Sequence, residues 1–245
     1  MIKLDRYFTP IYLTPQKVRE LTDEFKQNGT NVWNNDEIKK PLLMLSHNKC
    51  AYCECDLSKE SKYMEVEHFE DKNSNPDKVV KWDNLLPSCK RCNGSKSTHD
   101  VLSEPIINPF QSDPRQHLAM KLYRFVGIDN IGISTIEVID LNNTTRATIK
   151  RFEIGNAILD NLDVIKDSLN NYRGNPITKR KNKVIRQIEK LLLEAQPQSE
   201  YAATAATVLQ KESSYPAVKL ELQTLGLWNN DLEALDNISK DLAFN

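Results

Sequence analysis

The sequence predicts an α+β chain that is mainly α-helical, with a small non-helical module between an N-terminal helical segment and a C-terminal helical domain. Three observations carry this prediction. Thr14-Pro15, a helix-start signal, precedes apolar residues at helical spacing. Residues 49–100 contain two cysteine pairs and no sustained helical period. From about Arg146 onward, the helical period dominates the chain.

The N-terminal helical segment is predicted over residues 1–48. Thr14 can cap a helix whose first position is Pro15, and the apolar residues that follow at helical spacing are Val18, Leu21 and Phe25. A second helix is predicted from Asp36 towards Ser46. Pro41 lies inside this stretch, where a proline removes a backbone donor and can kink a helix.

Residues 101–142 are predicted to form a connecting segment. Pro105, Pro109 and Pro114 favour an ordered strap over regular structure. Thr135 to Leu141 fits either a strand or the entry into a helix.

Residues 143–245 are predicted to form the C-terminal helical domain. Gly174-Asn175-Pro176 and Gln196-Pro197-Gln198 separate its helices. Three apolar faces recur with the helical period: Ile158, Leu162, Ile165 and Leu169; Val184, Ile188 and Leu191; Leu232, Leu235, Ile238 and Leu242.

Bulk composition limits the class of protein. The net charge is −1, so no global field draws the chain to nucleic acid, although a local basic patch can still hold a few phosphates. No apolar run approaches the length of a membrane helix, and the first residues lack the apolar core of a signal peptide. We therefore expect a cytoplasmic protein, in which cysteines bind metal more often than they form disulfides.

The cysteine pattern predicts a structural zinc site. Cys50-Ala-Tyr-Cys53 and Cys89-Lys-Arg-Cys92 are two CxxC pairs, and each pair can direct two thiolates at one ion. Four thiolates close a tetrahedral shell and leave no position for substrate, so such a site supports the fold. Cys55 is the spare cysteine and competes with Cys53, but only Cys53 keeps the CxxC spacing.

The insertion between the two pairs carries a second pattern. Glu67-His68 comes first, Asn84-Leu85 follows, and Asn93 with Lys96 comes directly after the second pair. This order resembles the HNH (ββα-metal) endonucleases, specifically the subgroup that has a four-cysteine zinc site. The resemblance covers roughly residues 50–99 and implies a metal-dependent nuclease.

The chemistry of phosphodiester cleavage suits these residue types. His68 is suited to act as a general base near neutral pH. The carboxylate of Glu67 and the amide oxygen of Asn93 are hard ligands that suit Mg²⁺ or Mn²⁺. By resemblance, Asn84 holds the loop that positions the histidine.

Strand geometry raises one alternative for the metal ligand. Neighbours on a regular strand face opposite ways, so Glu67 and His68 converge only if the strand ends there, as the resemblance implies. If the strand continues, Glu65 shares a face with Glu67 and becomes the rival ligand. Glu67 is the favoured ligand.

Other polar residues are weaker candidates. Lys72, Arg91 and Lys96 are predicted phosphate contacts, for which ordinary solvated charges are the alternative. His99 could approach the metal, although a surface position is favoured. The basic run Lys179-Arg180-Lys181-Asn182-Lys183 is read as a solvated helix start, with a nucleic-acid or partner contact as the alternative.

The chain also resembles, over a wider range, the HNH nuclease subunit of Septu-type anti-phage systems and related retron-linked nucleases. The shared features are Asn108-Pro109, Asp113-Pro114, His117-Leu118, Leu141-Asn142 and Arg146 ahead of a helical tail. This resemblance implies a partner ATPase, which would bind to the C-terminal helices. It also implies that the substrate is DNA, or else RNA. Two alternatives stay open: a stand-alone restriction-type HNH enzyme, and a non-catalytic zinc module that only binds nucleic acid.

Overall fold

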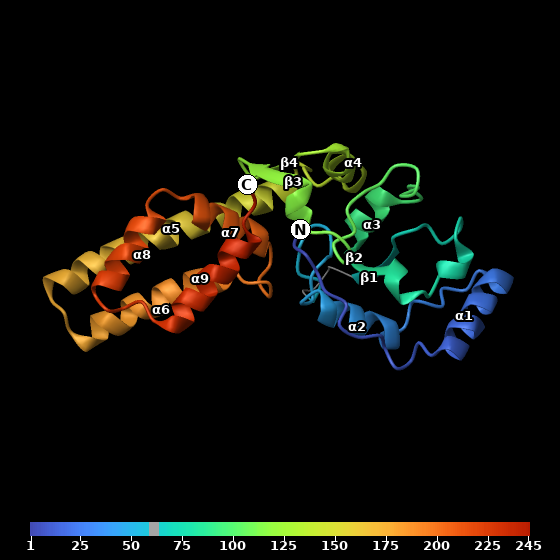
Figure 1. Ribbon diagram of the computed structural model, residues 1–245, viewed down its shortest axis with the longest axis horizontal. Helices are drawn as coiled ribbons and strands as arrows, with labels where there is room; N and C mark the ends of the chain where they lie inside the picture. The colour runs from blue at the N-terminus through green and yellow to red at the C-terminus, as the bar shows by residue number, and fades with distance from the viewer. Residues whose placement is uncertain (59–63) are drawn as a thin grey trace. The chain divides into compact units, whose positions relative to one another are not determined.

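The computed structural model describes residues 1–58 and 64–245, which form two compact units (Figure 1). The first unit comprises Met1–Ala119 and Phe125–Asn143, and the second comprises Met120–Arg124 and Thr144–Asn245. Helices predominate and the sheets are small, which confirms the mainly helical α+β class.

Local sequence signals set the two N-terminal helices. Helix α1 (Pro15–Asn28) begins where predicted, because the side chain of Thr14 accepts a hydrogen bond from the Lys17 amide at 3.1 Å. Helix α2 (Asp36–Leu45) is capped in the same way by Asn35, and it contains Pro41 within its length. Both predicted helices are therefore confirmed.

A strand–strand–helix unit follows the first cysteine pair. Strand β1 (Met64–His68) pairs antiparallel with strand β2 (Leu85–Cys89), and helix α3 (Lys90–Lys96) follows β2 directly. Short 3-10 helices at Pro76–Lys78 and Trp82–Asn84 occupy the connection between the strands. Cys89 caps α3, because its Sγ accepts from the Cys92 amide at 3.5 Å. The chain thus leaves β2 and enters α3 at the second cysteine pair.

The connecting segment is more regular than its prolines predict. After a 3-10 helix at Pro114–Gln116, strands β3 (Leu118–Lys121) and β4 (Arg124–Gly127) form a two-stranded sheet. Helix α4 (Asn130–Ile139) then covers most of the stretch that fitted either a strand or a helix. The helix prevails because the Asp129 side chain caps it, accepting from the Gly132 amide at 2.8 Å.

The second unit contains a helical core. Its helices are α5 (Ala147–Gly174), α6 (Thr178–Glu194), α7 (Ala202–Lys211), α8 (Tyr215–Thr224) and α9 (Asn230–Leu242). Helix α5 packs against α6 and α7, and α9 also packs against both (Figure 1). The predicted apolar faces of α5 and α6 are buried in this core.

The apolar face predicted for the last helix is only partly correct. Leu232 is buried in α9, but Ile238 is 41% exposed. The buried positions of α9 include Asp236 and Ser239. The Asp236 carboxylate accepts hydrogen bonds from the Tyr215 hydroxyl at 2.6 Å and from Lys219 Nζ at 2.7 Å. These partners offset the cost of burying a charge, so Asp236 can lie on the core side of α9 together with Leu232.

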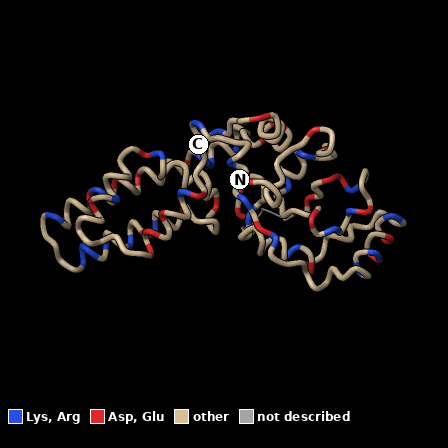
Figure 2. The backbone as a smooth tube through the Cα atoms, in the orientation of Figure 1, with Lys and Arg blue, Asp and Glu red and all other residues tan. Residues whose placement is uncertain are grey.

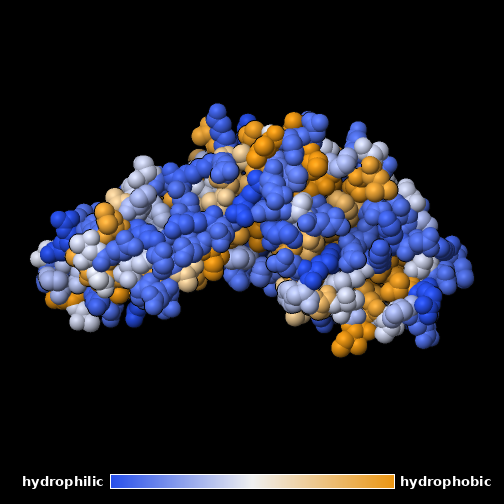
Figure 3. All heavy atoms as spheres, in the orientation of Figure 1, coloured by the Kyte–Doolittle hydropathy of each residue, from blue (hydrophilic) through white to orange (hydrophobic). Residues whose placement is uncertain are grey.

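Acidic and basic residues alternate along the backbone of both units (Figure 2). The face drawn in Figure 3 is mostly hydrophilic, with hydrophobic groups scattered over it. Within the described residues, no helix combines the length and apolar character that a membrane span requires. This mixed surface agrees with the net charge of −1. Any attraction of a charged ligand must therefore come from a local site and not from the electrostatic field of the whole chain.

Candidate metal centre and catalytic cavity

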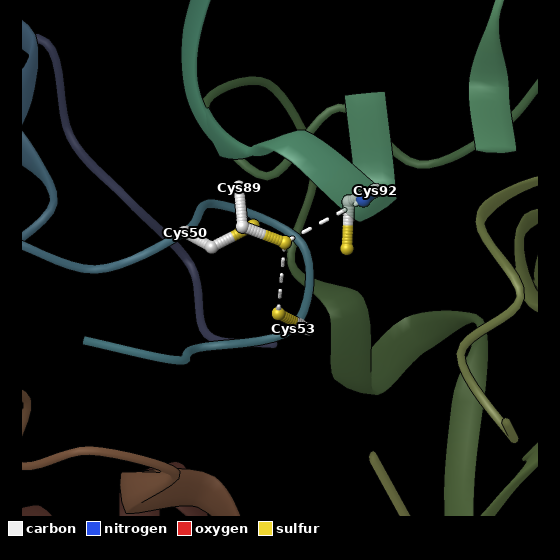
Figure 4. Close-up of side chains that lie close together, drawn as sticks. All are labelled: Cys50, Cys53, Cys89 and Cys92. Atoms are coloured by element: carbon white, nitrogen blue, oxygen red, sulfur yellow. Dashed lines mark hydrogen bonds between the residues drawn. The ribbon is translucent and has the colours of Figure 1, made fainter. Parts of the chain in front are cut away.

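The four predicted zinc ligands lie together in the first unit. Cys50 and Cys53 come from the turn after α2, Cys89 ends β2, and Cys92 lies in α3. Their sulfur atoms all lie within 4.8 Å of one another, and all four side chains are buried. Figure 4 shows the thiol of Cys89 directed towards Cys53. Two segments far apart in the sequence thus supply one cluster.

The spacing of these sulfurs fits a tetrahedral zinc ion. Zinc–sulfur bonds of about 2.3 Å in a tetrahedron place the sulfurs about 3.8 Å apart, and Cys53 Sγ lies 3.8 Å from Cys89 Sγ. The pKa values of the Cys53 and Cys92 thiols are raised well above the usual value, first by contact with Cys50 and also by burial. A divalent cation would relieve this cost, so the cluster is compatible with zinc.

The fifth cysteine has a different place. Cys55 is buried and its thiol contacts those of Cys50, Cys53 and Cys89, but it does not belong to the four-sulfur group. Its backbone carbonyl accepts from the Cys50 amide at 2.9 Å, which closes the first cysteine turn. The second cysteine segment reaches this turn through a hydrogen bond from the Ala51 amide to the Pro87 carbonyl at 2.8 Å.

A cavity of about 370 Å³ adjoins this frame. Residues from α2, β1, α3 and the adjoining loops line it: Asn31, Trp33, Asn34, Lys39, Met64, Glu65, Val66, Glu67, His68, Asp71, Lys72, Asn93 and Ser97. His68, Glu67 and Asn93 of the predicted site therefore face one space, together with the rival ligand Glu65.

Strand β1 ends at His68, where the chain turns into a loop, as the resemblance implies. Pairing with β2 continues to the last residue, with Glu67 opposite Leu86 and His68 opposite Leu85. Glu65 and Glu67 thus occupy the same face of a regular strand. His68 still reaches the cavity because it is the final strand residue, where the chain begins to turn.

The His68 ring is held on two sides. Its Nε2 lies 2.8 Å from the carbonyl oxygen of Val79, which can only accept, so Nε2 carries the hydrogen. The Trp33 ring meets it edge to face, with centroids 4.6 Å apart. Burial lowers the pKa of His68 to about 4, so the ring is neutral near pH 7 and its Nδ1 is left as an acceptor.

Comparison with known proteins identifies the family. The chain is 43% identical over 237 residues to the Septu protein PtuB of Bacillus thuringiensis, an alignment covering 96% of this chain and 92% of that protein. The chain belongs to the Septu PtuB family. A PtuB protein of Bacillus mycoides (strain KBAB4) is 29% identical over 36% of this chain and 40% of its own length. No family model and no solved structure matches significantly.

In this PtuB-family chain, Lys96 does not line the cavity. Its side chain is fully buried, and its Nζ lies 2.7 Å from Glu67 Oε1 and 3.0 Å from the carbonyl oxygen of His68. Burial raises the pKa of Glu67 to about 7, and the Lys96 charge opposes that rise. The phosphate contact predicted for Lys96 does not fit this position. Packing of α3 against β1 turns the lysine inward, where it holds the end of the strand.

Asn84 lies in the position that the resemblance implies for a loop-holding residue. It is buried, and its Oδ1 accepts from the Glu70 amide at 2.7 Å. Its Nδ2 donates to the carbonyl oxygens of Glu70 at 3.0 Å and Lys78 at 3.2 Å. The loop fixed in this way leads directly to Val79, which holds His68.

The remaining candidates divide between the cavity and the surface. Lys72 lines the cavity, with its Nζ 5.3 Å from the centroid of Trp33. Arg91 is exposed and hydrogen-bonds Asn143 at 3.5 Å, away from the lining residues. His99 hydrogen-bonds the Glu104 carbonyl at 2.8 Å and is not among the lining residues, in agreement with the surface position favoured for it.

Sequence reasoning missed one wall of the cavity in this PtuB-family chain. Asn31, Trp33 and Asn34 come from the loop between α1 and α2, and Lys39 comes from α2. The sequence treated this region only as a helical segment. The available signal was the run Asn31-Val-Trp-Asn-Asn35 between two predicted helices, because binding residues lie disproportionately on loops.

Proposed function

We propose that this chain is an HNH-type endonuclease that hydrolyses phosphodiester bonds of nucleic acid, DNA first of all, as part of a Septu anti-phage defence complex. The supporting observation is the common cavity of His68, two strand carboxylates and Asn93, adjoining the four-cysteine frame. Family membership supports the defence role. One structural zinc ion per chain is part of the same proposal.

The residues at the cavity fit a hard divalent cation. Glu65 and Glu67 present carboxylates from one face of β1, and Asn93 presents an amide from α3. Asn93 Nδ2 lies 2.6 Å from Glu65 Oε2, which brings these two groups within reach of one ion. Mg²⁺ or Mn²⁺ held here would neutralise charge on the phosphate and on the leaving oxygen. We assign Glu67 and Asn93 as ligands, with Glu65 as the alternative carboxylate.

His68 is proposed to take a proton from the attacking water. Its Nε2 hydrogen is committed to Val79, so Nδ1 is the atom that accepts the proton. Asn84 holds the loop that leads to Val79, and Lys96 holds the His68 carbonyl. The ring orientation is thereby fixed before substrate arrives, which lowers the cost of reaching the reactive geometry.

The test is plasmid nicking by the purified full-length chain with Mg²⁺ or Mn²⁺, with and without the ATPase encoded beside it. Metal-dependent nicking supports the proposal. Vigorous cutting by a chain that binds no ATPase would favour the stand-alone alternative. Nucleic-acid binding without cleavage under every metal and partner condition would favour the non-catalytic zinc module.

Isosteric substitutions separate the two candidate carboxylates. Glu67→Gln removes the charge but keeps an oxygen for Lys96, whereas alanine would leave a buried lysine without its partner. If Glu67 is a ligand, Glu67→Gln should weaken Mn²⁺ binding by more than the roughly 10- to 100-fold that loss of an outer-shell partner costs, as should Asn93→Ala. Calorimetric titration with Mn²⁺ measures this. Unchanged affinity in Glu67→Gln with a loss in Glu65→Gln would move the ligand role to Glu65.

The second unit is proposed to dock the ATPase. Removing residues 144–245 should abolish co-purification with the ATPase and protection against phage, because the first unit holds the proposed nuclease groups but not the helical core. A pull-down and a plaque assay measure both effects. Zinc content and protease resistance must show that the remaining chain is folded. Retained co-purification by a folded truncation would place the docking surface in the first unit.

A further inference from the structure

The cavity has a wall that the proposed chemistry does not use. Asn31, Trp33 and Asn34 form one side of it, and Lys39 extends that side along α2. Phe25 of α1 contacts the Trp33 ring, with centroids 5.7 Å apart. Helix α1 thus holds this loop against the cavity.

The reactive groups lie at the bottom of the recess. His68 is 6% exposed and Glu67 is 2% exposed. The phosphates of an undistorted duplex lie on the outside of a broad cylinder, and a paired base cannot leave the stack without unpairing. A phosphate that reaches His68 must therefore belong to a strand that can enter the cavity, which has the volume of a small-molecule pocket.

The chemistry of the wall suits a nucleotide. Lys39 and Lys72 both line the cavity, and within residues 1–58 and 64–245 neither has a carboxylate partner at ion-pair distance. Asn31 and Asn34 are exposed amides, which can both donate to and accept from a base edge. Single-strand binding sites in general combine cations that follow the backbone with aromatic side chains and polar groups beside the bases.

We propose that Asn31, Trp33, Asn34 and Lys39 form a subsite for one unpaired nucleotide of a single-stranded polynucleotide, next to the phosphate at His68. This subsite rests on the proposed nuclease function and defines its substrate class: single strands, or unpaired stretches and ends of duplexes. Lys39 contacts a backbone phosphate, the two asparagines contact the base or sugar, and Trp33 keeps the loop against His68.

Lys39 and its neighbour Lys40 provide a matched pair for the test. Lys39 lines the cavity, whereas Lys40 is exposed and forms an ion pair with Asp36 at 3.0 Å. Full-length zinc-loaded protein that retains His68, in Ca²⁺ in place of Mg²⁺ to hold back cleavage, is titrated with a labelled single-stranded DNA, the same sequence as RNA, and the blunt DNA duplex. Fluorescence anisotropy at several salt concentrations gives the affinity and its salt dependence.

The single strands should bind about tenfold or more tightly than the duplex, which must first unpair. Lys39→Ala should weaken single-strand binding and reduce the slope of log affinity against log salt by about 0.7, the loss of one phosphate contact. Lys40→Ala should leave the slope unchanged. Trp33→Phe should retain binding and Trp33→Ala should lose it. If both DNA and RNA bind, the contacts are to the base and the phosphate. If only one of the two nucleic acids binds, the asparagines also contact the sugar.

Equal affinity for duplex and single strand, with Lys39→Ala behaving as Lys40→Ala, would overturn the subsite. Plasmid nicking by the wild-type chain would in that case still stand, so the nuclease proposal would survive. Conversely, the predicted binding pattern without cleavage under any metal or partner condition would refute the nuclease and leave the subsite. If Trp33→Ala fails to fold, the two lysine variants decide the question.

Discussion

Replacing Cys89 with serine should release the zinc ion and unfold the part of the chain around β1, β2 and α3. Cys89 caps α3 through its sulfur, and serine is itself a good helix cap, so the substitution keeps the cap and removes the thiolate. Structural zinc contributes roughly 10–16 kcal/mol in small zinc-binding peptides, which is as large as the whole stability of a typical domain. We expect insoluble or protease-sensitive protein, measured by zinc content and limited proteolysis.

Cys55→Ser is the matched control for this prediction. Cys55 is equally buried and lies beside the same turn, but it is outside the four-sulfur group. This variant should keep about one zinc ion per chain, retained in mild EDTA that removes the catalytic cation. Zinc loss in Cys55→Ser together with zinc retention in Cys53→Ser would mean that Cys55, and not Cys53, is the zinc ligand.

Replacing His68 with alanine should lower the cleavage rate by about 10²- to 10⁴-fold, because a general base contributes by that order to the chemical step. The fold and the zinc content should persist, since the cysteine frame does not include this ring. Single-turnover cleavage with saturating metal and partner measures the effect. Comparable cutting by mutant and wild type would remove His68 from the mechanism.

His68→Gln separates the chemical role from the structural one. The glutamine amide places an N–H near the position of the histidine Nε2, so it can still donate to the Val79 carbonyl, but it cannot act as a base. It should therefore be as inactive as His68→Ala, with a melting temperature nearer to that of the wild type. Recovery of activity in His68→Gln would mean that His68 acts only by holding the loop.

Local patterns determined much of this protein from its sequence. Thr14-Pro15 set the start of α1, and the helical period set the buried faces of α5 and α6, because each signal acts between near neighbours in the chain. The two CxxC pairs predicted the four-sulfur cluster for a similar reason. Each pair is a local turn, and one cation can be shared only if the pairs meet.

Tertiary packing decided the rest, since it joins residues that no local pattern relates. Lys96 looked like a surface cation, but the fit of α3 against β1 buries it beside Glu67 and the carbonyl of His68. Asp236 lies buried in α9, which the apolar pattern of that helix did not predict, because partners from α8 and from the end of α7 satisfy its charge. Trp33 lies in the loop between α1 and α2, and its ring contacts the ring of His68 at the end of β1. This contact makes the N-terminal segment part of the wall of the cavity. The exposure and the partners of a side chain depend on which helices and strands pack together, and that packing depends on the whole fold.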